Sequence, residues 1–214
     1  MSRDRLKSGK RGLITLVSLG TYLGFGTLLD NELYRNKPVS EKTNNKIVDE
    51  ALEEYHRFNS GYIKEEKLCD IIEKEYYPAG NGPGYSCTKD AWSAAFVSYV
   101  MKEADIDFPG KFRHVDYFTE IRDHPRKYDC TTHPMSDILN IDEGDILCKG
   151  RSGSKPGYDI PAGKRMNSHC DIVTKVNNDS LNVIGGNVED TVYSDVVPKS
   201  SLGNSKYFGY ISCN

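Results

Sequence analysis

Three polar residues along the chain are of the types that nucleophilic catalysis uses. Ser93 comes first, within an apolar run, and is followed by His169 and then by Asn187. A serine hydroxyl is hardly ionised at neutral pH, so it must give its proton to an adjacent base as it attacks. His169 is the histidine placed to act as that base, and the Asn187 amide would hold its ring in the required tautomer. The sequence therefore predicts a Ser, His, Asn catalytic set.

Ser93 is expected in the first turn of a buried helix. Residues 91–101 are apolar almost all round, which is typical of a helix inside a core. Asp90 is expected to cap this helix, and the glycine-rich loop at residues 80–84 leads into it. A nucleophile at such an end lies in the positive field of the helix dipole.

The other expected elements give an α+β fold. Apolar residues at helical spacing predict packing helices over residues 41–59 and 63–77, and a further helix is expected over residues 112–123. Later segments predict the strands of one antiparallel sheet, at residues 144–148, 169–176, 181–184 and 207–212. Helices first and a sheet afterwards indicate the α+β class.

Four further residues are predicted to contact substrate: Trp92, His114, Tyr117 and Arg151. Arg151 lies in a segment rich in glycine and lysine, residues 149–164, where it would clamp a carboxylate. A surface loop without a binding role explains that segment equally well. Singly, each catalytic candidate also has an ordinary explanation, as a helix cap, a satisfied polar residue or a turn. Only the occurrence of all three residues in this order along the chain favours a catalytic site.

The N-terminus predicts a membrane anchor. Five basic residues within positions 1–11 precede an uncharged stretch, residues 12–29, and acidic residues follow at once. The positive-inside rule then keeps the N-terminus in the cytoplasm and exports the rest. The alternative, a buried core helix, is disfavoured by four glycines in the stretch. The expected layout is a basic N-terminus, the anchor at 12–29, a linker at 30–40 and one domain at 41–214.

Charge and cysteine content limit the classes of partner and ligand that the protein is expected to bind. The formal net charge of -3 offers no basic stripe, so nucleic acid is not an expected partner. Six cysteines show neither CxxC spacing nor a companion histidine pair of the zinc-finger type, so a structural metal site is not expected. No cofactor is expected either. Export would permit up to three disulfides, with Cys148 and Cys170 as the expected pair on neighbouring strands, whereas a reducing compartment would leave buried thiols. Cys170 is a poor replacement nucleophile beside His169, and Cys87 is a weak one.

The order of these segments resembles that of the papain-like cell-wall hydrolases of the NlpC and CHAP type. In those proteins the helix reads Trp-Cys-Ala or similar, and here Ser93 stands in the cysteine position. A closer resemblance is to the family called domain of unknown function 2272. Four segments carry it: residues 92–98, residues 144–151, residues 169–173 and residues 184–188.

The resemblance implies a papain-like domain that hydrolyses an amide bond in the peptide part of peptidoglycan, and the N-terminal anchor would hold this domain on the outer face of a cytoplasmic membrane. Ser93 would form the acyl-enzyme. The weakly apolar anchor is also similar in character to the releasable anchors of some bacteriophage lysis enzymes. Two alternatives stay open: an inactive domain that binds a wall peptide or a protein partner, and a structural membrane protein that shares only the fold.

Overall fold

The computed structural model describes residues 43–82, 84–204 and 206–213. The expected anchor at residues 12–29 and the linker at 30–40 lie outside the described residues. Among the helices of the described residues, none combines the length and the apolar character that crossing a bilayer requires.

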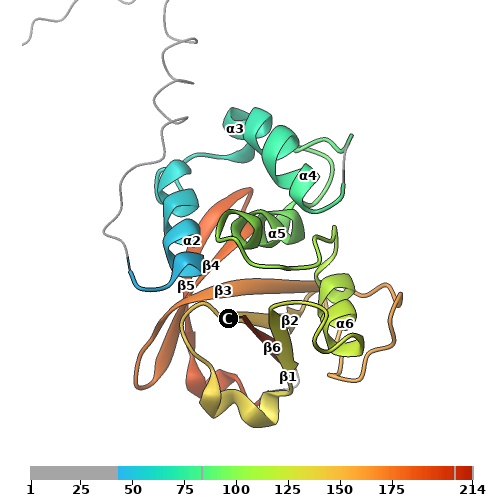
Figure 1. Cartoon of the computed structure of the whole chain (residues 1–214). Helices are drawn as coiled ribbons and strands as arrows, with labels where there is room; N and C mark the ends of the chain where they lie inside the picture. The colour runs from blue at the N-terminus through green and yellow to red at the C-terminus, as the bar shows by residue number, and fades with distance from the viewer. Residues whose placement is uncertain (1–42, 83, 205, 214) are drawn as a thin grey trace, which may run out of the picture. The chain divides into compact units, whose positions relative to one another are not determined.

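Six antiparallel strands form one sheet in the order β1-β6-β2-β3-β4-β5 (Figure 1). Their bounds are β1 Cys130–His133, β2 Ile146–Gly150, β3 Ser168–Val176, β4 Ser180–Val188, β5 Thr191–Pro198 and β6 Tyr207–Cys213. The four predicted strands correspond to β2, β3, β4 and β6, whereas β1 and β5 were not predicted. Both of these strands lie at the edges of the sheet, and β5 carries exposed apolar residues, Tyr193 and Val196. In neither segment does the sequence alternate regularly between apolar and polar residues, so neither was recognisable as a strand.

The helices precede the sheet in the chain, apart from short 3-10 turns, which confirms the α+β class. They are α2 Lys46–Arg57, α3 Glu65–Ile71, α4 Tyr77–Ala79, α5 Ser93–Glu103 and α6 His114–Asp123. A π-helical turn, Ile72–Tyr76, joins α3 to α4, so the helix predicted over 63–77 is interrupted. Helix α5 packs on β3 and β4, α2 packs on β3 and β5, and α6 packs on β1 and β3.

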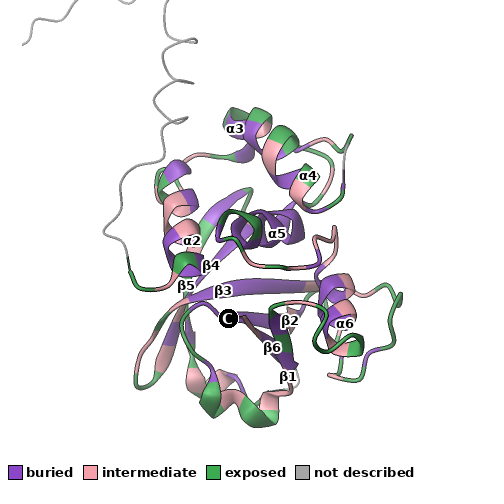
Figure 2. Cartoon of the chain, in the orientation of Figure 1, coloured by how far each residue is buried: buried purple, intermediate pink, exposed green. Residues whose placement is uncertain are grey.

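Helix α5 is the most deeply buried helix of the fold. Every residue from Ser93 to Met101 is buried, and Figure 2 shows the helix buried along nearly its whole length. The expected cap by Asp90 is wrong. Trp92 occupies the N-cap position, and the Asp90 carboxylate instead accepts a hydrogen bond from the Ser86 backbone N–H at 3.0 Å. Asp90 stands two residues too early to reach the first N–H groups of the helix.

Three disulfides link the cysteines: Cys69–Cys87, Cys130–Cys213 and Cys148–Cys170. The predicted Cys148–Cys170 pair is confirmed, and these two residues lie directly opposite each other on β2 and β3. Cys87 and Cys170 therefore present no thiolate that could replace Ser93. Glu73 lies close to Cys69 and Cys87, but the two sulfurs are bonded to each other and offer no thiolate to a metal ion.

Candidate functional site

Ser93 is the first residue of α5 and pairs with a histidine. Its Oγ lies 2.8 Å from Nε2 of His114, and both side chains line a cavity of about 330 Å³. Only 5% of Ser93 is exposed. The hydroxyl therefore has a nitrogen within the reach of a general base, and it lies at the positive end of the helix dipole.

The second ring nitrogen of His114 is hydrogen-bonded to a tyrosine hydroxyl. His114 and Tyr117 lie three residues apart in the first turn of α6, which places them on one face of the helix. His114 Nδ1 lies 2.5 Å from the Tyr117 hydroxyl. Ser93, His114 and Tyr117 therefore form one hydrogen-bonded chain, the serine relay.

Burial keeps this relay uncharged. Burial above all, then the neighbouring His169, holds the pKa of His114 well below its usual 6.5. Burial also raises the pKa of Tyr117 well above 10. A neutral imidazole has one protonated nitrogen, so Nε2 can accept the Ser93 proton when Nδ1–H donates to the Tyr117 oxygen. The relay can thus supply a base in its unprotonated form at neutral pH.

A second polar chain runs along the neighbouring strands. His169 Nε2 lies 2.7 Å from Asp171 Oδ1, and Lys149 Nζ lies 2.7 Å from Asp171 Oδ2. His169 and Asp171 are two apart on β3 and share a face of the sheet, while Lys149 stands opposite His169 on β2. We call these three residues the ionic relay.

The Asp171 carboxylate is the fixed charge of the ionic relay. Burial alone would raise its pKa, but His169 and Lys149 together hold the pKa well below the usual 3.8. Burial likewise opposes the charge on Lys149, yet Asp171 raises the pKa of that amine. Asp171 therefore stays ionised and accepts the His169 Nε2–H, which fixes the tautomer. Nδ1 of His169 is buried and has no hydrogen-bond partner among the described residues.

The two relays meet at their histidines. The ring centroids of His114 and His169 lie 5.1 Å apart, edge to face. Strand β4 passes so close that a Cβ atom on Gly185 would lie 2.2 Å from Asp171 Oδ1 and 2.9 Å from His169 Nε2. A Cβ on Gly186 would strike Phe96 on α5. The Gly-Gly pair therefore brings the sheet against both the ionic relay and the helix that carries Ser93.

The structure connects the predicted catalytic residues differently from the sequence prediction. Ser93 is hydrogen-bonded to His114, which was predicted as a substrate contact, and has no hydrogen bond to His169. Asp171 takes the orienting position predicted for Asn187. Asn187 instead donates to Glu65 Oε2 at 3.1 Å, next to a register shift in β4 and with a positive φ of 55°.

The predicted substrate contacts have different environments. Trp92 is fully buried, donates to Glu65 at 2.7 Å and packs on Phe58, so it is a core residue. Tyr117 is also fully buried, within the serine relay. Arg151 alone is exposed, and it lines the cavity that contains Ser93. Asp171 could have been found from its spacing to His169, because alternate residues of a strand share a face.

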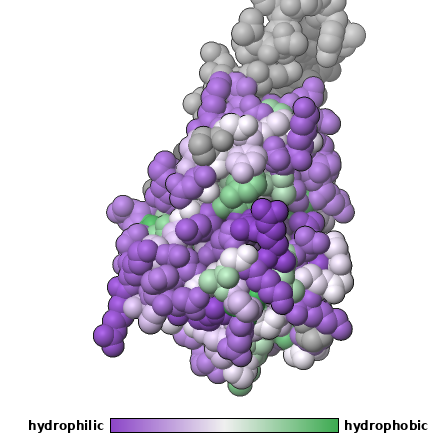
Figure 3. Space-filling model, turned by 90° about the vertical axis from the view of Figure 1, so that its right-hand side faces the viewer, coloured by the Kyte–Doolittle hydropathy of each residue, from purple (hydrophilic) through white to green (hydrophobic). Residues whose placement is uncertain are grey.

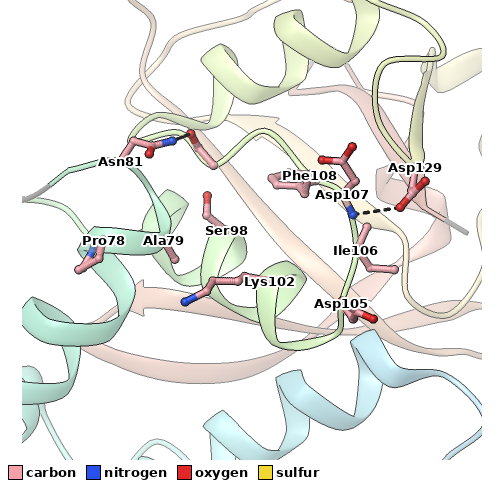
Figure 4. Close-up of a pocket in the computed structure, with 11 residues that line it drawn as sticks. Pro78, Ala79, Asn81, Ser98, Lys102, Asp105, Ile106, Asp107, Phe108 and Asp129 are labelled. Atoms are coloured by element: carbon pink, nitrogen blue, oxygen red, sulfur yellow. Dashed lines mark hydrogen bonds between the residues drawn. The ribbon is translucent and has the colours of Figure 1, made fainter.

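A separate cavity of about 560 Å³ lies beside the other end of α5 (Figure 4). Ser98 borders it, but its hydroxyl donates to the Ala94 carbonyl oxygen at 2.9 Å. Three aspartates, Asp105, Asp107 and Asp129, also line this cavity, and no histidine does. It therefore lacks the pairing of a nucleophile with a base that marks the Ser93 cavity.

Comparison with known proteins gives one family. A family model described as an uncharacterized protein conserved in bacteria (DUF2272) matches residues 64–206, a segment that contains both relays. No curated protein and no solved structure matches the chain. Because the matched segment covers more than half of the sequence, the chain belongs to the DUF2272 family of uncharacterised bacterial proteins.

Proposed function

We propose that this protein hydrolyses an amide bond in the peptide part of peptidoglycan, with Ser93 as the nucleophile and His114 as the base. One observation supports this most: the 2.8 Å hydrogen bond between Ser93 Oγ and His114 Nε2, at a cavity wall and at the N-terminus of α5. A paired hydroxyl and imidazole at such a position is the arrangement that acyl transfer requires.

The proposed reaction proceeds in two halves. Ser93 Oγ attacks the amide carbonyl carbon as its proton passes to His114 Nε2, and the N-terminal dipole of α5 stabilises the developing oxyanion. His114 then gives the proton to the departing amine, so the C–N bond breaks and an ester remains on Ser93. A water molecule then attacks the ester carbonyl as His114 takes one of its protons, and His114 passes that proton to Ser93 Oγ as the C–O bond to the serine breaks. Tyr117 accepts the Nδ1–H throughout and keeps Nε2 available.

His169 acts as a positioning residue in this proposal. Asp171 and Lys149 fix its ring, and the ring edge rests against His114. The papain-like resemblance assigns the base to His169 instead, and its partnerless Nδ1 is the feature that favours that assignment. Replacing each histidine by glutamine separates the two assignments, because only the true base should be needed to activate Ser93.

The fold supports the papain-like part of the proposal, and the cysteines support the proposed export of the domain. A nucleophile at the start of a helix packed on an antiparallel sheet, with a histidine on β3, fits a papain-like arrangement. Three disulfides are expected of a domain that folds in an oxidising compartment, which supports export. An anchor at residues 12–29 and a role as a phage-type lysis enzyme belong to the same proposal.

A second candidate function is binding of a wall peptide without cleavage. The low exposure of Ser93, at 5%, favours it, because a substrate carbonyl must reach Oγ. Digestion of purified peptidoglycan by the full chain, followed by mass spectrometry of the soluble fragments, tests both functions. Hydrolysis should release fragments with new amine and carboxylate ends, and Ser93→Ala should release none. Binding of the chain to peptidoglycan without any release of fragments would refute the hydrolase.

A further inference from the structure

Three adjoining cavities border the segment that joins β2 to β3, residues 151–167. The Ser93 cavity is the smallest, at about 330 Å³. A cavity of about 810 Å³ shares Phe112, Arg113, Met166 and Asn167 with it, and a third, of about 490 Å³, shares Arg151 and Ser152. We call the three together the cationic cleft. It extends well beyond what one scissile bond requires.

The segment that borders the cleft is fastened to α6. Arg122 donates from Nη1 to the carbonyl oxygens of Tyr158, at 2.6 Å, and Ile160, at 2.8 Å. The Tyr158 ring also packs edge-on against Phe118. The cleft is therefore held to the helix that carries His114.

Positive charge gathers in the cleft. Seven cations and one carboxylate line it, although the whole chain has 31 acidic and 28 basic residues. Two of the cations are neutralised, because Arg113 pairs with Asp116 and Lys149 with Asp171. The other five are exposed and have no ion pair with a described residue: Arg151, Lys155, Lys164, Arg165 and Lys206. Clefts lined by one sign of charge concentrate ligands of the opposite sign.

An aromatic pair forms part of the wall of the largest cavity. The rings of Tyr85 and Phe112 stack with their centroids 4.1 Å apart, and Tyr85 is 40% exposed. Phe112 also borders the Ser93 cavity. Figure 3 shows the side of the molecule on which α6 lies: its surface is mostly hydrophilic, with small apolar areas. The cleft therefore offers cations and a limited apolar surface together.

We propose that the cationic cleft binds an extended acidic peptide, whose carboxylates pair with the five unpaired cations while one of its amide bonds reaches Ser93. This inference rests on the proposed function for the reacting end of the ligand. Peptides are favoured over phosphate polymers because the neighbouring serine relay suits amide cleavage. Guanidinium groups such as Arg151 and Arg165 bind carboxylates and phosphates alike with two parallel hydrogen bonds, so the choice of a peptide rests on the serine relay.

Binding to insoluble peptidoglycan tests the cleft without any need for cleavage. The full chain with Ser93→Ala is sedimented with native peptidoglycan and with peptidoglycan whose carboxyl groups have been amidated. We expect about fivefold weaker binding to the amidated polymer, and a similar loss when Lys164→Gln and Arg165→Gln are combined. The matched control, Lys67→Gln with Lys175→Gln, removes two exposed cations elsewhere and should bind as before.

Equal binding to the native and amidated polymers, or an equal loss in the control, would overturn the cleft proposal. Competition by duplex DNA at the same charge concentration as peptidoglycan would also overturn it, in favour of a phosphate polymer. The outcome is separate from that for hydrolysis. Carboxylate-dependent binding without cleavage leaves the cleft proposal standing and removes the hydrolase, whereas cleavage that amidation does not affect removes the cleft proposal alone.

Discussion

Tyr117→Phe removes a single hydroxyl from the serine relay and leaves the packing of the ring intact. Tyr117 is fully buried and lies against Phe108, so phenylalanine should fill the same space. The change leaves His114 Nδ1 without its partner in a site where His114 is 3% exposed. A buried polar atom that loses its hydrogen bond costs about 1–3 kcal/mol, so the free energy of unfolding should fall by that amount.

The same substitution should reduce catalysis more than it reduces substrate binding. Without the Tyr117 oxygen as acceptor, His114 is free to carry its proton on Nε2, and that tautomer cannot take the Ser93 proton. We expect kcat on peptidoglycan to fall about 10- to 100-fold with little change in KM, since a general base contributes about 100-fold or more.

Urea unfolding and initial rates measure the two effects. Tyr62→Phe is the matched control, because Tyr62 is 84% exposed and should change stability by less than about 0.5 kcal/mol. A Tyr117→Phe chain with unchanged stability and unchanged kcat would refute the assignment of Tyr117 as the group that fixes the His114 tautomer.

Two further predictions concern the histidines and the glycine beside them. Because burial and His169 hold the pKa of His114 below 6.5, only the unfolded chain takes up that proton as the pH falls below about 6.5. The contribution to stability is complete above that pH and declines by up to about 1.4 kcal/mol per pH unit below it. His114→Gln should therefore flatten the pH dependence of unfolding. Gly185→Ala should displace Asp171 and His169, lowering stability by about 1–3 kcal/mol and reducing activity, whereas Gly203→Ala, where a Cβ meets nothing within 4 Å, should be nearly neutral in urea unfolding.

Local patterns predicted the elements of the site but not their pairing. The apolar run at residues 91–101 predicted a buried helix with Ser93 in its first turn, and the structure has that helix as α5. The Cys148–Cys170 disulfide was predicted because both residues lie on strands expected to be neighbours, and β2 and β3 place them opposite each other. These are properties of single elements or of pairs close in the chain.

The partner of Ser93 depends on how α6 packs against the sheet, and no periodicity within residues 114–123 specifies that. His114 was therefore predicted to contact substrate, and His169 to contact Ser93. Asn187 was predicted to orient the His169 ring because it lies on the next expected strand. The pairing of β4 with β5 shifts register between Gly185 and Val188, and Asn187 instead donates a hydrogen bond to Glu65. The partners of Ser93 and Asn187 are thus determined by tertiary packing and by the irregular register of β4, and the spacing of residues in the sequence does not predict them.

Labelling with a fluorophosphonate, a reagent that bonds covalently to activated serine hydroxyls, tests the central claim most directly. The full chain should acquire one adduct, and peptide mapping should place it on Ser93. His114→Gln should slow the labelling by about 100-fold, the contribution of a general base, while His169→Gln should slow it less. No adduct on Ser93, or labelling of the His114→Gln chain at the wild-type rate, would contradict the account.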